Sequence, residues 1–255
     1  MRGRLLLNVL LLAGVTALAF WLWRDTPPVT GVSELAPAAV QRIAVERRGE
    51  RSLELVRADS GWRLQVPREL PASQQHLELL LGFLQLPVTA RYPSAEVDLA
   101  GAGLIAPLLT VSFNESRYAF GGLDPLGQQR YLLHEDEVLL VQEGVSALLI
   151  SPWWNFIDRR LLPEGEPRRL HFSDGEIHTL ASNEPRTAHW QHGAAAIVRP
   201  WLDEVRGEMF ELELVSGQRL PWQWLDGEQP GLLRPDLGLV YQLSAEQLNE
   251  LLGRQ

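Results

Sequence analysis

Cysteine and lysine are both absent from this chain of 255 residues. Without cysteine there are no disulfides, thiolate nucleophiles, cysteine-ligated zinc sites or iron–sulfur clusters, and no lipidated N-terminal cysteine. Without lysine there is no P-loop lysine and no Schiff base. All 23 basic residues are arginines and they face 32 acidic residues, which gives a formal net charge of −9. Because phosphate neutralisation needs a basic surface, this charge argues against nucleic acid as the main partner.

The remaining composition is typical of a folded protein rich in turns. Hydrophobic residues make up 45% of the chain and charged residues 22%, which excludes a wholly disordered chain. The 21 glycines and 17 prolines have no collagen-like period. The length allows one large core or two small ones.

An apolar segment without charged residues runs from Leu5 to Trp23. As an α-helix it would be about 28 Å long, close to the roughly 30 Å of a bilayer's hydrocarbon core. Arg2 and Arg4 precede it, and the positive-inside rule then keeps the N-terminus in the cytoplasm. We therefore predict a transmembrane anchor over residues 1–24 and a stiff linker over residues 25–40. This places the chain in the inner membrane of a Gram-negative bacterium as a single-pass protein with most of its residues in the periplasm.

A cleaved signal peptide is the alternative for this segment. Ala17-Leu18-Ala19 matches the small-residue pattern that precedes signal cleavage. The run from Phe20 to Trp23 favours a retained anchor, because it completes the span and would make a poor mature N-terminus. A buried core helix is a third interpretation, but no second apolar segment exists to pack around it.

Alternating apolar and polar residues predict a first α+β unit over residues 41–151. A leucine-rich helix is expected from Pro71 and Ser73 to about Leu86, and a short helix at 145–150. The predicted strands lie at 42–46, 53–56, 61–66, 108–113, 117–120, 130–134 and 138–142.

The same order of elements recurs over residues 168–255, after a connector at 152–167. Strands are expected at 169–172, 177–180, 187–191, 210–215, 219–224 and 239–243, and helices at 194–206 and 244–252. Trp62 and Trp190 would then both lie in a third strand. At an offset of 100 residues, the chain repeats Leu132, Leu133, Asp136, Leu139, Gln142 and Leu148. We predict an α+β fold of two tandem units, each a β-meander plus helix with an antiparallel sheet. A single continuous sandwich is the alternative.

No segment matches a known pattern of catalytic or metal-binding residues. His189 and His192 are expected in a strand, where residues three apart point to opposite faces, so they favour no metal site. Ser146, in Gly144-Val145-Ser146-Ala147, lacks the second glycine of a nucleophile elbow and has no obvious base nearby. The acidic run 134–137 fits a solvated hairpin turn, whereas acid–base catalysis needs a desolvated carboxyl. The segment 101–103 lacks the third glycine of a dinucleotide-binding motif. We predict no catalytic, cofactor-binding or metal-ligating residue.

The connector combines three aromatic residues with two arginines: Trp153, Trp154, Phe156, Arg159 and Arg160. These residue types are enriched at the centres of protein interfaces, so they form a candidate interaction surface. The alternative is that the aromatic side chains fill the boundary between the two units while the arginines pair with nearby acids.

A series of short motifs follows the N-terminal segment in a fixed order. They are Gly61-Trp62-Arg63-Leu64 with Pro67, Gly103-Leu104 with Pro107, Phe120 to Pro125 with Arg130-Tyr131, and Asp158 to Leu162. This order resembles the bacterial family called domain of unknown function 4340, over residues 40 to 165. The resemblance implies a single-pass envelope protein, since some members of that family are associated with ABC transporters of the gliding-motility type. It implies no catalytic residues.

The sequence therefore favours a non-enzymatic accessory or scaffold subunit of an envelope complex. We expect an envelope protein and the membrane as its partners, and no nucleic acid, metal or cofactor. Two alternatives remain: a periplasmic domain that binds a small ligand between the units, and an envelope hydrolase that acts through carboxylates.

Retention of the anchor can be tested directly. We expect mass spectrometry of the protein from purified membranes to detect residues 1–19, because the apolar segment is long enough to span the bilayer. A mature chain that begins at Phe20 would contradict the anchor and establish a cleaved signal peptide.

Overall fold

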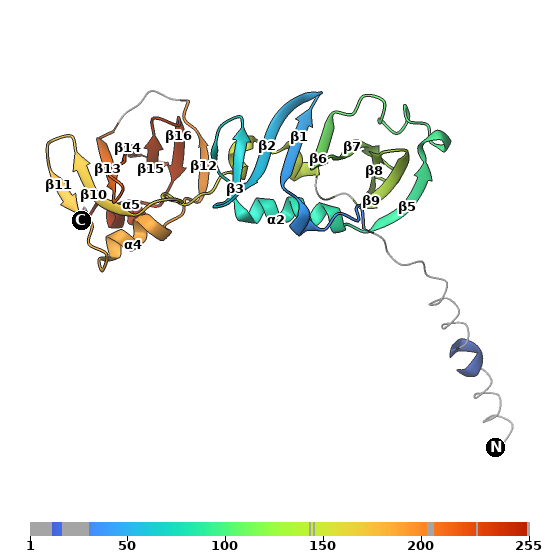
Figure 1. Ribbon diagram of the computed structural model, residues 1–255, viewed down its shortest axis with the longest axis horizontal. Helices are drawn as coiled ribbons and strands as arrows, with labels where there is room; N and C mark the ends of the chain where they lie inside the picture. The colour runs from blue at the N-terminus through green and yellow to red at the C-terminus, as the bar shows by residue number, and fades with distance from the viewer. Residues whose placement is uncertain are drawn as a thin grey trace, which may run out of the picture.

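The computed structural model describes residues 12–16, 31–142, 144, 146–202, 207–227 and 229–253. Two antiparallel sheets with a few helices form most of it, which confirms the α+β prediction (Figure 1). The predicted anchor lies outside the described residues except for 12–16, which are helical. Within the described part of the chain, no helix is both long and apolar enough to cross a membrane.

The first sheet has nine strands in the order β4-β3-β2-β1-β6-β7-β8-β9-β5. Its strands are β1 (Arg42–Arg47), β2 (Glu50–Ala58), β3 (Gly61–Val66), β4 (Leu70–Pro71), β5 (Val88–Pro93), β6 (Leu109–Phe113), β7 (Ser116–Leu123), β8 (Gln129–His134) and β9 (Glu137–Gln142).

The second sheet has seven strands in the order β11-β10-β13-β14-β15-β16-β12. Its strands are β10 (Pro167–Phe172), β11 (Ile177–Thr179), β12 (Ile197–Pro200), β13 (Met209–Leu214), β14 (Arg219–Leu225), β15 (Gly231–Arg234) and β16 (Leu239–Gln242).

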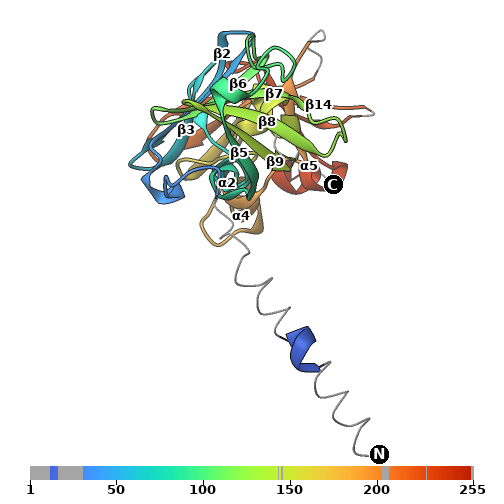
Figure 2. The same cartoon turned by 90° about the vertical axis from the view of Figure 1, so that its right-hand side faces the viewer.

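Both sheets carry helices on one side (Figures 1 and 2). The first sheet is covered by α2 (Gln74–Gly82) and its 3₁₀ continuation η2 (Phe83–Gln85), and the second by α4 (Pro185–His192) and α5 (Ala245–Leu252). Leu77 and Leu80 of α2 are buried, as the leucine spacing predicts. Ser244 caps α5 in a capping box with Gln247. The shorter helices are α3 (Ser146–Ile150), η1 (Pro37–Ala39), η3 (Ser94–Glu96) and η4 (Trp153–Phe156).

The two sheets share one strand order over seven positions. The series β2-β1-β6-β7-β8-β9-β5 corresponds to β11-β10-β13-β14-β15-β16-β12, so that β3 and β4 are the only strands of the described residues without a counterpart. Leu132 and Leu139 face the main core, and so do Leu232 and Leu239 at the offset of 100 residues. The next positions along β8 and β15, Leu133 and Leu233, face the opposite side of their sheets.

A loop covers that opposite side in each sheet, at the same place in the strand order. In the first sheet, Ala102 and Leu104 pack on Val138, and the Gly122 N–H donates to the Ala102 carbonyl oxygen (2.8 Å). A Cβ at Gly121 would collide with that oxygen, so this close approach requires glycine. In the second sheet, Trp201 packs on Leu225, Leu233 and Val240.

Two predicted elements of the second unit are wrong. Residues 187–191, predicted as a strand, lie in α4, and residues 194–206, predicted as a helix, contain β12 instead. Pro185 occupies the first turn of α4, where its missing N–H costs nothing and its fixed φ suits a helix. Trp190 therefore lies in a helix and does not correspond to Trp62. Strands β4, β5, β12 and β15 are missing from the prediction.

The sheets meet edge to edge, with the connector between their edge strands β4 and β12. On one side, the Ser73 N–H donates to the Phe156 carbonyl oxygen and the Asp158 N–H to that of Pro71, both at 2.8 Å. Facing β12, the Leu161 N–H donates to the Gly193 carbonyl oxygen at 3.0 Å, and the Ala195 N–H to that of Arg159 at 2.8 Å. We call this boundary, residues 156–162 with the two edges they contact, the seam.

The hydrophobic core runs across the seam without a break. Phe156, Ile157, Leu161 and Leu162 belong to one buried cluster that also contains side chains of both sheets. The sheets therefore form one core side by side and do not stack face to face as in the sandwich alternative (Figure 1).

The described part of the predicted linker belongs to the first unit. Val32 and Val40 are buried in the core. The Val32 N–H donates to the Leu86 carbonyl oxygen (3.0 Å), and Gly31 forms a bridge with Pro87, at the start of the outer edge strand β5. The chain thus enters the first sheet at the edge that faces away from the seam.

The continuity of the core predicts a large effect of Leu161→Ala. Leu161 is 1% exposed, and truncation of a buried leucine costs about 2–5 kcal/mol of unfolding free energy. Leu126→Ala is the matched control, because Leu126 is 82% exposed and the change should be within about 0.5 kcal/mol. Chemical denaturation checks this difference, and equal midpoints for the two variants would contradict the described packing.

Candidate functional site

The aromatic residues of the connector face mainly inward. Phe156 is 1% exposed and belongs to the core. Trp153 and Trp154 are half-buried, pack against that core and meet edge to face, with ring centroids 5.7 Å apart and planes at 80°. Of the predicted interaction surface, the two indoles are therefore only partly accessible, and Phe156 is not.

The two arginines of the connector are exposed but already have partners. Arg159 donates to the Ala196 carbonyl oxygen (3.0 Å) and to the Gln75 side chain (3.4 Å), so it ties the second unit to α2. Arg160 donates two hydrogen bonds to the Asp158 carboxylate, at 2.9 and 2.6 Å. These bonds raise the pKa of the Arg160 guanidinium.

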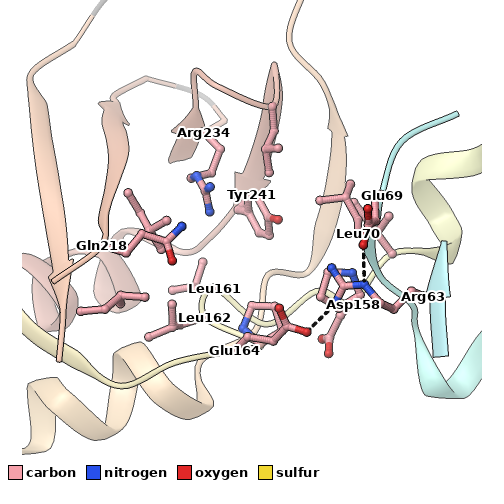
Figure 3. A pocket seen from close by; sticks show the side chains of 16 residues that line it. Arg63, Glu69, Leu70, Asp158, Leu161, Leu162, Glu164, Gln218, Arg234 and Tyr241 are labelled. Atoms are coloured by element: carbon pink, nitrogen blue, oxygen red, sulfur yellow. Dashed lines mark hydrogen bonds and ion pairs between the residues drawn. The ribbon is translucent and has the colours of Figure 1, made fainter. Parts of the chain in front are cut away.

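A cavity of about 280 Å³ lies along the seam (Figure 3). It is lined by residues from β3 and β4, from the connector, and from β13 to β16 of the second sheet. We call it the seam cavity. Its lining residues are Arg63, Glu69, Leu70, Pro71, Ile157, Asp158, Leu161, Leu162, Pro163, Glu164, Leu214, Gln218, Leu220, Arg234, Leu237 and Tyr241.

Two arginines on opposite sides of the seam cavity are held by carboxylates. Arg63 of β3 pairs with Glu69 (3.2 Å) and with Glu164 of the connector. Arg234 of β15 donates from Nε and Nη2 to the Asp236 carboxylate at 2.9 and 2.7 Å. The Arg234 guanidinium also lies 5.0 Å from the ring centroid of Trp222, a cation–π contact. Both guanidinium groups are therefore fixed in position.

Tyr241 of β16 places a phenol at the seam cavity. The residue is 5% exposed, and burial raises the pKa of its hydroxyl to about 12. Among the described residues, no hydrogen-bond partner is found for this hydroxyl. The phenol is therefore a neutral donor at physiological pH, ready to bond an acceptor inside the cavity.

The other residues considered in the sequence do not converge on a site. His189 and His192 lie in the last turn of α4, where His189 approaches Glu250 at 3.6 Å. Within the described ranges, no group of three or more histidine, aspartate or glutamate side chains could hold a metal ion. Residues 134–137 span the turn between β8 and β9, as predicted. Ser146 begins α3, and residues 101–103 lie in the loop over the first sheet.

The two most buried carboxylates of the described residues belong to different sheets. Glu54 of β2 pairs with Arg42 (2.6 Å) and Arg51 (3.1 Å) in the first sheet. Glu213 of β13 lies 2.6 Å from His171, and this hydrogen bond lowers the pKa of the Glu213 carboxyl. Neither carboxylate lines the seam cavity, where an acid–base pair of a hydrolase could face one another.

A pocket between the units is one of the alternatives that the sequence leaves open, but the residues that line the seam cavity are not predicted. Arg63 is expected only in a strand and in one of the family-like motifs, and Arg234 and Tyr241 have no assigned role. Their convergence depends on how β3, β15 and β16 meet at the seam, which neither residue spacing nor composition encodes.

Comparisons with known proteins give no match to a family model, a curated protein or a solved structure.

The raised pKa of Tyr241 has a consequence that can be measured. An unfolded tyrosine has a pKa of about 10, so stability due to the neutral buried phenol is complete below that pH and is lost as pH rises towards about 12. Burial also raises the pKa of Tyr118, so Tyr241→Phe should lower the amplitude of the high-pH tyrosine transition in an ultraviolet titration by one residue and leave the rest of it in place. Tyr92→Phe, a control at an exposed position, should leave the high-pH amplitude unchanged. A full high-pH amplitude in Tyr241→Phe would contradict the assignment.

Proposed function

We propose that this protein is a non-enzymatic, single-pass inner-membrane protein. Its periplasmic domain would act as an accessory or scaffold subunit of an envelope complex, such as an ABC transporter. The observation that carries this proposal is the end-to-end arrangement of the two sheets. The chain enters at the outer edge of the first sheet, through the bridge of Gly31 with Pro87, and the second sheet continues from the opposite edge.

This arrangement would suit a scaffold because it sets the distance of each sheet from the membrane. With an anchor before residue 31, the first sheet would lie next to the membrane and the second sheet further away. The main-chain hydrogen bonds of the seam join both sheets into one body, so the second sheet would be held at a defined distance. Tethering also raises the effective concentration of the domain near a membrane-bound partner.

The two units also fit an origin by internal duplication. Seven strand positions correspond in order, and Leu132, Leu133 and Leu139 have counterparts of the same orientation at the offset of 100 residues. The link to transporters depends on the resemblance to the family of membrane-anchored proteins, which the motif order alone supports.

The candidate contact surface is the accessible part of the connector: Trp153, Trp154, Arg159 and Arg160. Half-exposed indoles, followed a few residues later by exposed arginines, would supply apolar area and charged hydrogen-bond donors on one short segment. Because Phe156 is buried, it would support this surface from below.

Affinity purification from native membranes tests the proposal. We expect full-length protein in mild detergent to recover a specific envelope protein, and Trp154→Ala to recover at least about tenfold less, because an interface tryptophan contributes strongly to affinity. Leu126→Ala, at an exposed position on the turn after β7, is the control and should recover the wild-type amount.

Each other outcome is informative. Matched melting temperatures of the two variants would show that Trp154→Ala is folded. Recovery of no specific protein by the wild type would overturn the scaffold role, and equal recovery by the two variants would overturn the assigned surface.

A further inference from the structure

We propose that a groove on the first sheet binds an extended segment of a partner protein in which an arginine or lysine stands next to aliphatic residues. We call it the outer groove, because it lies on the face of the sheet opposite α2, between the loop at 104–107 and the ends of β7 and β8. This inference goes beyond the scaffold role and does not depend on it, since the described residues that line the groove all belong to the first unit.

Four apolar residues line the outer groove. Leu104 and Pro107 come from the loop, whereas Ala119 and Leu133 come from β7 and β8. The groove has a volume of about 410 Å³, within the roughly 300–1,000 Å³ typical of ligand pockets. An aliphatic side chain placed here would lose its contact with water on an apolar surface.

Two large aliphatic side chains stand in solvent beside these residues. Ile105 follows Leu104 and Leu108 follows Pro107 along the loop, and the two are 72% and 70% exposed. A single exposed aliphatic residue is ordinary, but two next to an apolar groove form a larger apolar surface of the kind that marks interaction sites. A bound segment with aliphatic residues would cover them.

The polar groups at the groove are mainly hydrogen-bond acceptors. Glu115 lies in the turn between β6 and β7, and Glu135 in the turn between β8 and β9; both are exposed, and neither has an ion-pair partner in the described part of the chain. His134 Nδ1 lies 2.9 Å from the Arg117 carbonyl oxygen. Because a carbonyl oxygen can only accept, Nδ1 carries the proton, and Nε2 of the neutral ring is a further acceptor.

The charges around the outer groove are mostly negative. Residues 94–108, 114–117 and 134–137, which form the loop and the two turns, contain six acidic residues and one arginine. That arginine, Arg117, already pairs with Glu46 at 3.0 Å. The excess persists when the adjoining strands and turn are included: seven carboxylates then stand against four guanidinium groups. The added residues are Glu46, Arg48, Arg91 and Arg130.

This combination selects a basic and aliphatic segment as the occupant. Arginine and lysine place an aliphatic stem on an apolar surface while the cationic head reaches a carboxylate. A nucleic acid or an anionic lipid would be repelled by the excess of negative charge. Since Glu115 and Glu135 are exposed, their pairing adds little free energy, so the apolar contacts supply most of the affinity and the carboxylates decide which segment is accepted.

Fluorescence anisotropy with the full-length protein in an uncharged detergent tests this inference. The probes are three labelled tripeptide amides: leucyl-arginyl-leucine, the same peptide with citrulline in place of arginine, and seryl-arginyl-serine. We expect the first to bind with a dissociation constant on the order of 1 mM or tighter, and the other two to bind at least about fivefold more weakly. Raising the salt concentration from about 50 to about 500 mM should weaken only the arginine peptides.

Variants locate the site. Glu115→Gln combined with Glu135→Gln should weaken binding of leucyl-arginyl-leucine amide about fivefold and leave the citrulline peptide unchanged, because only the charge of the site is altered. Asp59→Asn combined with Glu246→Gln is the matched control, since it removes two charges at exposed positions on the β2–β3 turn and on α5, and it should bind like the wild type. Ile105→Ser should weaken both leucine peptides.

Several results would overturn the proposal. These are no binding of leucyl-arginyl-leucine amide up to about 5 mM, equal binding of the citrulline or the serine peptide, and wild-type affinity in the variant that lacks both carboxylates. Recovery of a partner through the connector is a separate measurement, so failure of this inference and failure of the scaffold role are distinguishable.

Discussion

Four main-chain hydrogen bonds at the seam determine the architecture. Both neighbours of the connector are sheet edges, whose unpaired N–H and C=O groups would be costly to bury without partners. Residues 156–161 satisfy groups on both edges at once, through Ser73 and Asp158 on one side and Leu161 and Ala195 on the other. The same segment contributes Phe156, Ile157 and Leu161 to the continuous core. One short stretch of chain therefore pairs the edges, joins the cores and forms a wall of the seam cavity.

Much of the first unit can be predicted from local patterns, because its strands are short apolar segments separated by turn residues. The leucine spacing of α2 reports burial directly, whereas β1 has three consecutive buried residues, Ile43 to Val45, because both of its faces are covered. The second unit shows where such patterns fail. In residues 187–191, apolar and polar side chains alternate as they do in a strand, but the segment is helical. Thr187 and Trp190 are three residues apart, so the helix places both on its buried face. This error also removes the stated reason against a shared face for His189 and His192.

The candidate site shows a different limit. Aromatic residues and arginines of the connector are visible in the sequence, and the connector does lie at the boundary of the two units. Their orientation is decided by packing: Phe156 is buried, and Arg159 and Arg160 hold other parts of the seam. The polar groups of the seam cavity come from separate strands of both sheets, so their proximity is a property of topology. The motif order that resembles a known family includes four residues that line the cavity, Arg63, Asp158, Leu161 and Leu162, but the order alone does not show that they converge.

Because the connector occupies the inner edges, the open edges of the two sheets lie at opposite ends of the long axis (Figure 1). They are unequal: β5 is flanked at its start by Gly31, whereas β11 is only three residues long and contains His178, which forms a hydrogen bond with Glu176. Short or charged edges resist the addition of foreign strands. The seam thus leaves two open sheet edges on the described part of the chain, where two separate open sheets would present four.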